Sequence, residues 1–316
     1  MQKRRPFYDY VSCGLVRTLV GDGRVACPRI APDQIGKGSE EAVARDRFLR
    51  QAGPRMSEGD AMTKRSAGRV ALITGGSRGI GAATAERLAE DGAAIAICDL
   101  DGAGAAATAA QIASRHGVAA HGFTTNVGVA AEVERLVEDI VARLGSLDIL
   151  VNNAGITRDN LIHRMTEEDW DEVALVHLKG SFLCSRAAQR EMVKRNWGRI
   201  INLSSGAALG NRGQTNYSTA KAGLQGMART LAIELGRFGI TVNAVAPGYI
   251  DSDMTRAVAI RLGRDPEEFK AERAKAIPVG RVGVPRDVAN VIAFLASEDA
   301  SFVSGQVIYV AGGPRG

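Results

Sequence analysis

Short apolar runs alternate with helical stretches from residue 69 to the end of the chain, and this alternation limits the possible folds more than any other feature. Runs such as 69–74 and 147–151 have the length and composition of strands buried on both faces of a sheet. The intervening segments space their apolar residues as helices do, most clearly over 130–144. Strands joined by helices form right-handed βαβ units. We therefore expect an α/β fold in which a doubly wound parallel sheet of about seven strands carries helices on both faces.

The expected elements occupy most of the chain after residue 68. Strands are predicted at 69–74, 93–98, 118–123, 147–151, 199–203, 240–245 and 306–310. Helices are predicted at 79–90, 103–114, 130–144, 167–194, 216–236 and 285–296. The segment 251–278 is rich in charged residues, and we expect it to be a mobile lid that determines substrate specificity.

The first 61 residues differ from the rest in charge and pattern. Length alone, at about 150 residues per domain, predicts two domains for 316 residues. However, residues 1–61 hold 11 Lys and Arg against 8 Asp and Glu, a net of +3 in a chain whose total is +5. Apart from a short candidate helix at 39–51, they show no lasting period. We expect a disordered N-terminal extension at 1–61 and one domain at 62–316, beginning at Met62.

Three interpretations of this extension compete. Its arginines suit a transit peptide, but its acids do not. A basic tail for nucleic acid or membranes would have its charges in a denser run. The third interpretation, a poorly ordered tail read from an upstream start codon, fits the pattern best.

Composition excludes several other classes of protein. No apolar run approaches the about 18 residues of a transmembrane helix. The four cysteines are far apart and the four histidines do not cluster with them, which argues against a disulfide framework and a zinc site. We therefore expect a cytoplasmic protein. The computed pI of 9.2 reflects the extension more than the domain.

A glycine-rich loop follows the first expected strand and opens the first helix. In Thr74–Gly81, the glycines at 75, 79 and 81 allow a tight turn and a close approach of the backbone to a pyrophosphate. The helix N-terminus then offers free N–H groups to the anion. A plain strand-to-helix turn is the alternative. The position of the glycines favours a Rossmann-type dinucleotide site.

Asp99 closes the second expected strand, where the adenosine ribose would lie. A carboxylate there accepts hydrogen bonds from both ribose hydroxyls and repels a 2′-phosphate, which favours NAD(H). Arg78 in the glycine loop could pair with that phosphate, so NADP(H) is the alternative cofactor. Asp99 could also be a solvated turn residue.

Tyr217 and Lys221 are four residues apart in an expected helix, so they lie one turn apart on the same face. A nearby ammonium lowers a tyrosine pKa, as general acid–base chemistry near neutral pH requires. The fifth expected strand ends just before Ser204 and Ser205, at the sheet edge that binds ligands in such folds. The pair alone could be a surface feature, but with the serines and the glycine loop it predicts an active site.

Together these features resemble the short-chain dehydrogenase/reductase family over about residues 69–313. The matching segments are Thr74–Gly81, Asp99, Asn152–Gly155, Ser204, Ser205, Tyr217, Lys221, Pro247–Ile250, Gly280–Pro285 and Ala311–Gly313. Within the family, Gly213–Tyr217 and Asp253–Thr255 are most similar to reductases of 3-oxoacyl thioesters. The resemblance implies hydride transfer between a nicotinamide cofactor and a ketone or secondary alcohol.

The resemblance also implies individual roles. Tyr217 would exchange a proton with the substrate oxygen, Ser205 would polarise the carbonyl, and Lys221 would bind the nicotinamide ribose and lower the Tyr217 pKa. The residues implied to bind the cofactor are Gly75, Ser77, Arg78, Gly79, Ile80, Gly81, Asp99, Asn126, Val127, Asn153, Ala154, Gly155, Tyr217, Lys221, Pro247, Gly248, Ile250 and Ser252. No metal ion is expected.

Two departures from the family pattern affect the catalytic residues. Matched from the fifth strand, the catalytic serine is Ser205; counted back from Tyr217, it is Ser204, and we choose Ser205 because strand register is better fixed than loop length. Many relatives have an asparagine that supports a proton relay at the position of His177. The histidine could serve the relay through a ring nitrogen or simply pack there.

A third departure concerns the substrate. Bacterial reductases of this type dock the acidic acyl carrier protein on two arginines, and the matching positions here are Asn196 and Phe238. Lys194, Arg195 and Arg237 lie next to them and could compensate. The carrier protein is therefore in doubt, and a CoA thioester or another small carbonyl compound is left open as the substrate.

We expect an oxidoreductase acting on a small carbonyl substrate, in the first place a 3-oxoacyl thioester of the carrier-protein or acetoacetyl-CoA type. A dehydrogenase of another small secondary alcohol is the alternative, and a non-catalytic dinucleotide- or nucleic-acid-binding protein is a remote one. We expect no nucleic acid or membrane partner. The resemblance implies a homotetramer built on the long helices at 167–194 and 216–236.

Overall fold

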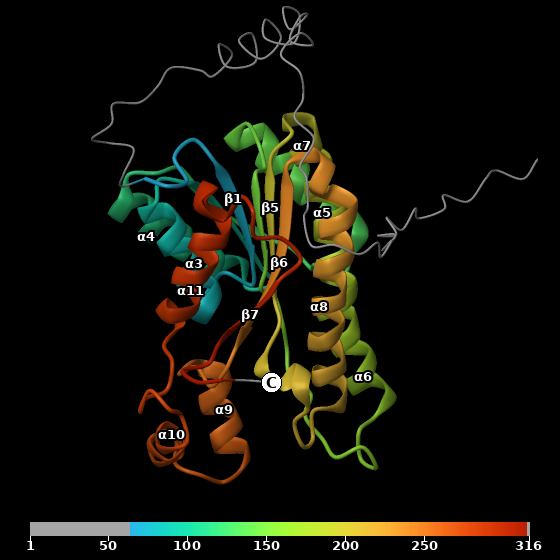
Figure 1. Cartoon of the computed structure of the whole chain (residues 1–316), viewed down its shortest axis with the longest axis vertical. Helices are drawn as coiled ribbons and strands as arrows, with labels where there is room; N and C mark the ends of the chain where they lie inside the picture. Colours follow the sequence, from blue (N-terminus) through green and yellow to red (C-terminus); the bar gives the residue numbers. More distant parts are fainter. Residues whose placement is uncertain (1–63, 315–316) are drawn as a thin grey trace, which may run out of the picture. The chain divides into compact units, whose positions relative to one another are not determined.

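The computed structural model describes residues 64–314, and its sheet is fully parallel. Seven strands lie in the order β3-β2-β1-β4-β5-β6-β7 (Figure 1). They are β1 (Val70–Thr74), β2 (Ala94–Asp99), β3 (Ala120–Thr124), β4 (Ile149–Asn152), β5 (Gly198–Leu203), β6 (Ile240–Pro247) and β7 (Val307–Val310). The winding reverses between β1 and β4, so a ligand-binding crevice is expected at their carboxyl ends. The predicted doubly wound sheet is confirmed.

Helices cover both faces of this sheet (Figure 1). One face carries α3 (Gly79–Glu90), α4 (Gly102–His116) and α11 (Pro285–Ala296). The other carries α5 (Ala130–Leu144), α7 (Gly180–Arg195) and α8 (Thr215–Leu235). Three further helices, α6 (Glu167–Ala174), α9 (Asp253–Arg261) and α10 (Pro266–Lys275), belong to the segments that follow β4 and β6 at the carboxyl edge.

The two faces of the sheet bury separate apolar clusters, as the two-residue period of a strand requires. On β1, Ala71 and Ile73 join the cluster beneath α3, α4 and α11, whereas Val70 and Leu72 join the cluster beneath α5, α7 and α8. All five β1 side chains are buried. This double burial explains why the strand is apolar throughout.

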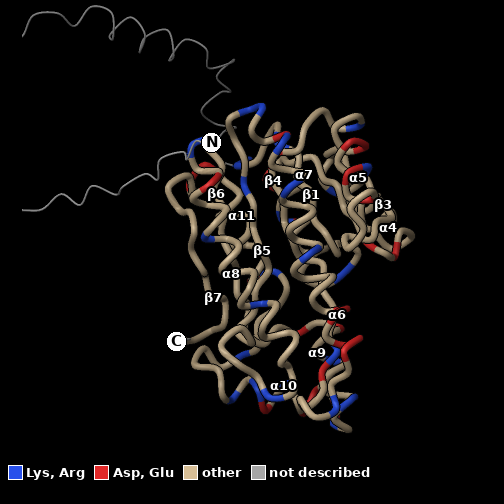
Figure 2. The backbone as a smooth tube through the Cα atoms, turned by 90° about the vertical axis from the view of Figure 1, so that its right-hand side faces the viewer, with Lys and Arg blue, Asp and Glu red and all other residues tan. Residues whose placement is uncertain are grey.

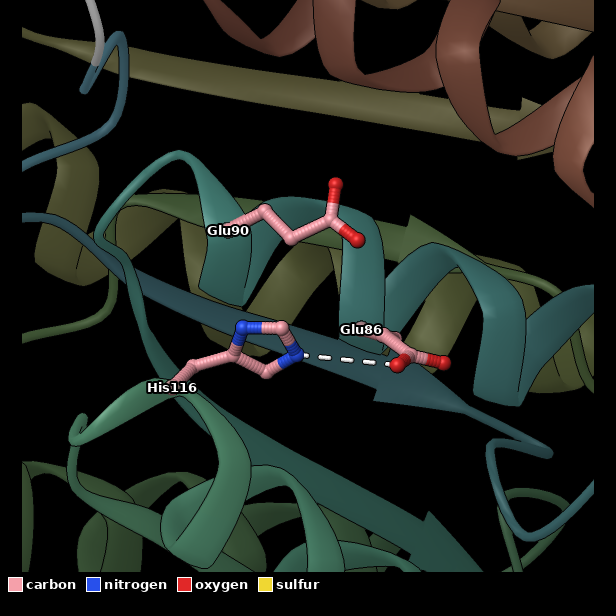
Figure 3. A group of neighbouring side chains, drawn as sticks. All are labelled: Glu86, Glu90 and His116. Atoms are coloured by element: carbon pink, nitrogen blue, oxygen red, sulfur yellow. Dashed lines mark ion pairs between the residues drawn. The ribbon is translucent and has the colours of Figure 1, made fainter.

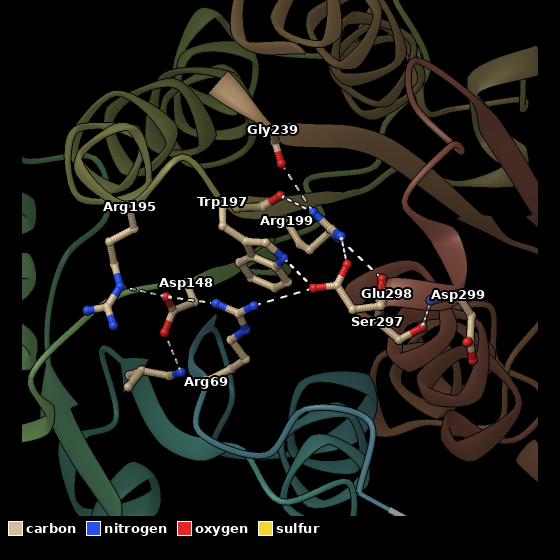
Figure 4. Close-up of polar contacts among 11 residues, drawn as sticks. Arg69, Asp148, Arg195, Trp197, Arg199, Gly239, Ser297, Glu298 and Asp299 are labelled. Carbon is tan, nitrogen blue, oxygen red and sulfur yellow. Dashed lines mark hydrogen bonds and ion pairs between the residues drawn. The ribbon is translucent and has the colours of Figure 1, made fainter. Parts of the chain in front are cut away.

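At the amino edge of the sheet, the Trp197 ring lies between two guanidinium groups (Figure 4). The Cζ atoms of Arg69 and Arg199 lie 3.6 Å and 4.3 Å from the ring centroid. Glu298 accepts from Trp197 Nε1 at 2.6 Å and from Arg199 Nη2 at 3.2 Å. Arg199 is only 2% exposed. The network joins the start of β5 to the turn after α11.

One predicted helix differs from the structure, and the predicted lid contains secondary structure that was not expected. The helix predicted at 167–194 is divided into α6 and α7 by a π-helical segment, Leu175–Lys179, which contains His177. The segment 251–278, predicted as a mobile lid, contains two helices with capped starts. Ser252 caps α9 in a capping box, and Asp265 caps α10 ahead of a proline at the first helical position.

The expected extension at 1–61 lies outside the described residues, with its candidate helix at 39–51, so the domain boundary at Met62 stays a prediction. Among residues 64–314, no helix has the length and apolar composition that would let it cross a bilayer.

Candidate active site

The glycine loop has the geometry of a phosphate cradle. A Cβ at Gly75 would lie 2.8 Å from Ala154 Cα, and one at Gly81 would collide with the carbonyl oxygen of Gly75, so neither position admits a larger residue. Helix α3 begins at Gly79, makes no side-chain cap bond at Arg78 and has no acid in its first turn. Its N–H groups are therefore free to bind an anion, and the loop fits a dinucleotide pyrophosphate.

Thr74 and Asn153 fix the shape of this loop. The Thr74 hydroxyl accepts hydrogen bonds from the backbone N–H groups of Asn153 and Ala154, both at 3.0 Å. Asn153 Nδ2 donates to the carbonyls of Thr74 and Gly75 at 2.9 Å and 2.8 Å. This role of the Thr74 hydroxyl was not predicted, although the position of Thr74 between the strand and the first glycine was a signal.

Asp99 ends β2 beside the glycine loop. Its Oδ2 accepts from the backbone N–H of Ser77 at 3.2 Å and from the Ser77 hydroxyl at 2.6 Å. Arg78 is exposed. The carboxylate thus lies against the glycine loop, and the neighbouring loop residue is a cation.

The other residues expected to bind the cofactor line the same carboxyl edge or lie just beneath it. Asn126 Oδ1 accepts from Gly128 N–H at 3.0 Å, which shapes the turn after β3. Val127 and Ile250 are buried, whereas Ser252 is partly exposed at the start of α9. The remaining residues that we expect to bind the cofactor at this edge are Ile80, Gly155, Pro247 and Gly248.

The two candidate serines face different partners. The Ser204 hydroxyl is buried, donates to the Lys221 carbonyl at 2.8 Å and accepts from Gln225 Nε2 at 3.1 Å. The Ser205 side chain is partly exposed and hydrogen-bonds with Tyr217, which counteracts the rise in the tyrosine pKa. The geometry therefore supports Ser205 as the serine that faces Tyr217.

Tyr217 and Lys221 lie on one face of α8, as expected, and burial has the largest effect on the pKa of each. The Lys221 ammonium nitrogen lies 5.4 Å from the centroid of the Tyr217 ring and donates to the Leu203 carbonyl at 2.5 Å. Burial raises the Tyr217 pKa to about 12 and lowers the Lys221 pKa to about 7. Burial is the largest cause of the rise in the Tyr217 pKa, so the expected lowering of this pKa by Lys221 stays a prediction.

His177 lies in the π-helical segment and contacts the loop after β4. Its Nε2 lies 3.1 Å from Ile156 N and 2.9 Å from Ile156 O. Its Nδ1 is buried and has no hydrogen-bond partner among the described residues. Burial, and then the charge of Lys221, lower the His177 pKa to about 3, so the ring is neutral.

One group of side chains could suggest a metal site elsewhere. Glu86, Glu90 and His116 lie together between α3 and α4 (Figure 3). However, Arg115 pairs with Glu86 and Arg286 pairs with Glu90, so both carboxylates already have cationic partners. We assign no metal ion to this cluster.

The family of the chain follows from comparisons with known proteins. A family model described as enoyl-(acyl carrier protein) reductase matches residues 75–314. The crystal structure of levodione reductase superposes with a TM-score of 0.76 at 34% identity, covering 79% of this chain and 98% of that one. The chain belongs to the short-chain dehydrogenase/reductase family. It is accordingly an oxidoreductase whose family uses a nicotinamide cofactor.

Several characterised short-chain dehydrogenases/reductases are close in sequence. The 3-oxoacyl-(acyl-carrier-protein) reductase FabG of Aquifex aeolicus is 47% identical over 247 residues, which are 78% of this chain and 97% of that protein. The short-chain reductase NovJ of Streptomyces niveus is 46% identical, covering 77% and 93%. The (2S)-((R)-hydroxy(phenyl)methyl)succinyl-CoA dehydrogenase subunit BbsD of Thauera aromatica is 46% identical, covering 78% and 96%.

The cations expected to compensate for the missing carrier-docking arginines have other partners. Lys194 pairs with Glu191 at 2.7 Å, and Arg195 pairs with the buried Asp148 at 3.5 Å. Arg237 stacks over the ring of Phe238, its neighbour in the chain. Two of the three cations are thus already paired with acids in this structure.

Proposed function

We propose that this chain reduces the ketone of a 3-oxoacyl thioester with a nicotinamide cofactor. The observation that carries this proposal is the pairing of Tyr217 and Lys221 on one face of α8, with Lys221 Nζ 5.4 Å from the centroid of the Tyr217 ring and Ser205 interacting with the tyrosine hydroxyl. The FabG relatives at 46–47% identity support the substrate class. The bound nicotinamide would supply the hydride.

Tyr217 acts as the acid in reduction. A tyrosine whose pKa is about 12 holds its proton at neutral pH, and a developing alkoxide is basic enough to take it. Ser205 donates a second hydrogen bond to the same oxygen, which stabilises the charge that develops there. Both hydroxyls are thus available to the substrate oxygen.

Lys221 and His177 position these groups. Lys221, on the same face of α8 as Tyr217, would bind the ribose of the cofactor. His177 is neutral, so it supports the site by contact with Tyr217 and with the backbone of Ile156 rather than as a charged acid. We favour a positioning role for His177, because its Nε2 contacts the Ile156 backbone and its ring packs edge-on against Tyr217.

For the cofactor we propose NAD(H) over NADP(H). The Asp99 carboxylate lies next to Ser77, where it can bind ribose hydroxyls and would repel a 2′-phosphate. Arg78 is a single exposed cation, and it does not occupy the end of β2 itself.

For the thioester carrier we propose CoA rather than an acyl carrier protein. Asn196 and Phe238 stand where two docking arginines are expected, and Lys194 and Arg195 are paired with acids. A small thioester does not need such a docking patch.

One assay panel tests the proposal. Purified enzyme is given NADH or NADPH with acetoacetyl-CoA, a 3-oxoacyl carrier protein or an unrelated cyclic diketone. The proposal predicts the highest kcat/KM for acetoacetyl-CoA with NADH. A diketone that is turned over with a higher kcat/KM than either thioester would overturn the substrate class.

A further inference from the structure

The lid, residues 251–278, pairs half of its charged side chains internally. Acidic and basic residues lie side by side around α9 and α10 (Figure 2). The ion pairs inside the lid are Arg256–Asp251, Lys270–Asp251, Lys270–Glu267 and Arg264–Glu272. Within residues 64–314, the one lid ion pair that reaches outside the lid joins Arg261, the last residue of α9, to Asp159.

Asp159 joins three segments at one carboxylate oxygen. Its Oδ2 accepts from Arg261 Nη2 at 2.5 Å and from Gln214 Nε2 at 3.1 Å. The next residue, Asn160, forms an isolated parallel bridge with Gln214. The Asp159 side chain is only 14% exposed, so its charge is poorly screened. The lid is therefore held to the loop after β4 and to the loop that leads into α8.

This junction lies close to the reacting groups. Gln214 is the N-cap residue of α8 and precedes Tyr217 by three positions. The charge of Asp159 also contributes to the raised pKa of Tyr217, after burial. A change in the ion pairing of Asp159 should therefore change the pKa of the Tyr217 hydroxyl.

We propose that Asp159 is a positioning residue that couples closure of the lid to the catalytic tyrosine through its shared contacts with Arg261 and Gln214. When the lid is closed, Arg261 neutralises the carboxylate and α9 is held over the loop after β4. When the lid opens, the carboxylate loses Arg261 and retains only the hydrogen bond from Gln214. Closure thus favours substrate retention. This coupling rests on the proposed function only where turnover is assayed, because lid closure can be measured without substrate.

The first test uses hydrogen exchange and needs no substrate. The variants Arg261→Met and Asp159→Asn are compared with Arg256→Met, a matched control that removes an Arg–Asp pair inside the lid. We expect faster amide hydrogen exchange over 253–275 in the first two variants. Exchange at sites far from Arg261, such as β1, should have the wild-type rate. Equal acceleration in the Arg256→Met control, or none in the two variants, would overturn the proposal, whatever the substrate.

The second test uses turnover of acetoacetyl-CoA, or of the best substrate found. We expect each variant to raise KM about two- to fivefold with little change in kcat, as loss of a partly buried ion pair would. The double variant should be no worse than the poorer single variant. Fully additive effects would show that Asp159 and Arg261 act independently.

The pH profile of the oxidation direction separates coupling from simple loss of structure. Asp159→Asn removes a negative charge near Tyr217 and should move the profile to lower pH, whereas Arg261→Met leaves the carboxylate uncompensated and should move it to higher pH. Lys221 and His177, which also face Tyr217, are unchanged in both variants. Shifts of the same sign would contradict the proposed coupling.

Discussion

The His177 ring lies edge-on to the Tyr217 ring, with centroids 5.3 Å apart and planes at 89°. The same imidazole contacts the backbone of Ile156 through Nε2. A Cβ at Gly155 would collide with the ring, so the loop after β4 lies directly against it. One buried ring thus connects the π-helical segment, the cofactor-side loop and the catalytic helix.

If His177 acts by position, an amide can replace it. His177→Asn should keep kcat within about threefold, because its amide can both donate to and accept from the Ile156 backbone. His177→Leu leaves those groups unpaired and should lower kcat at least about tenfold. Steady-state kinetics test the need for a polar side chain here: because relatives carry a relay asparagine at this position, an asparagine variant with near wild-type kcat fits either role. A leucine variant with wild-type kcat would show that the polar contacts of His177 are not needed.

The low pKa of His177 predicts acid sensitivity. The folded form stays neutral down to about pH 3, whereas the unfolded chain binds a proton below about pH 6.5. The free energy of unfolding should therefore fall as pH drops below 6.5, by up to about 1.4 kcal/mol per pH unit from this group.

Urea unfolding of wild type and His177→Asn between pH 7 and pH 5 measures this effect. The variant should lose less stability on acidification, while a matched change at the exposed His163 should alter nothing. Parallel curves for wild type and His177→Asn would mean that the histidine is not held neutral by the fold.

Cofactor choice should depend on the charge of Asp99. Asp99→Asn keeps an acceptor for Ser77 but removes the charge that repels a 2′-phosphate, so the ratio of kcat/KM for NADH to that for NADPH should fall about tenfold or more. The wild-type ratio should exceed one. A wild-type enzyme with a higher kcat/KM for NADPH would show that Arg78 outweighs Asp99.

The amino-edge network should affect stability but not catalysis. Arg199→Met removes the donors to the carbonyls of Gly198 and Gly239 and to Glu298 Oε2, while Trp197 Nε1 still donates to Glu298 Oε1. The free energy of unfolding should fall by about 2–4 kcal/mol. Kinetic constants should not change. The exposed pair Arg65–Asp299, 3.6 Å apart, is the control: Arg65→Gln should cost at most about 1 kcal/mol.

The sequence was most informative where one local rule determines the structure. The apolar β1 strand, the glycine loop and helices α5 and α11 were predicted within a residue or two, because burial on both faces, glycine geometry and helical spacing are local properties. The family membership followed from the same motifs. The homotetramer, the cytoplasmic location and the individual site roles stay predictions.

Other features depended on contacts between distant segments. The π-helical segment around His177 adds one residue to a turn and leaves no periodic trace in the sequence. Helix α10 has few apolar residues and α9 spans only 9 residues, although Ser252–Thr255 and Asp265–Pro266 were start signals that could have found them. The pairing of Asp159 with Arg261 spans 102 positions, which no local pattern reveals.

The central claim is that the Tyr217 hydroxyl transfers the proton in the reaction, and Tyr217→Phe tests it most directly. Phenylalanine can keep the edge contact with His177 and removes only the hydroxyl. We predict that kcat for acetoacetyl-CoA reduction falls about 10²–10⁴-fold, while NADH affinity, measured by fluorescence titration, changes less than about twofold. Turnover at the wild-type rate in this variant would contradict the account.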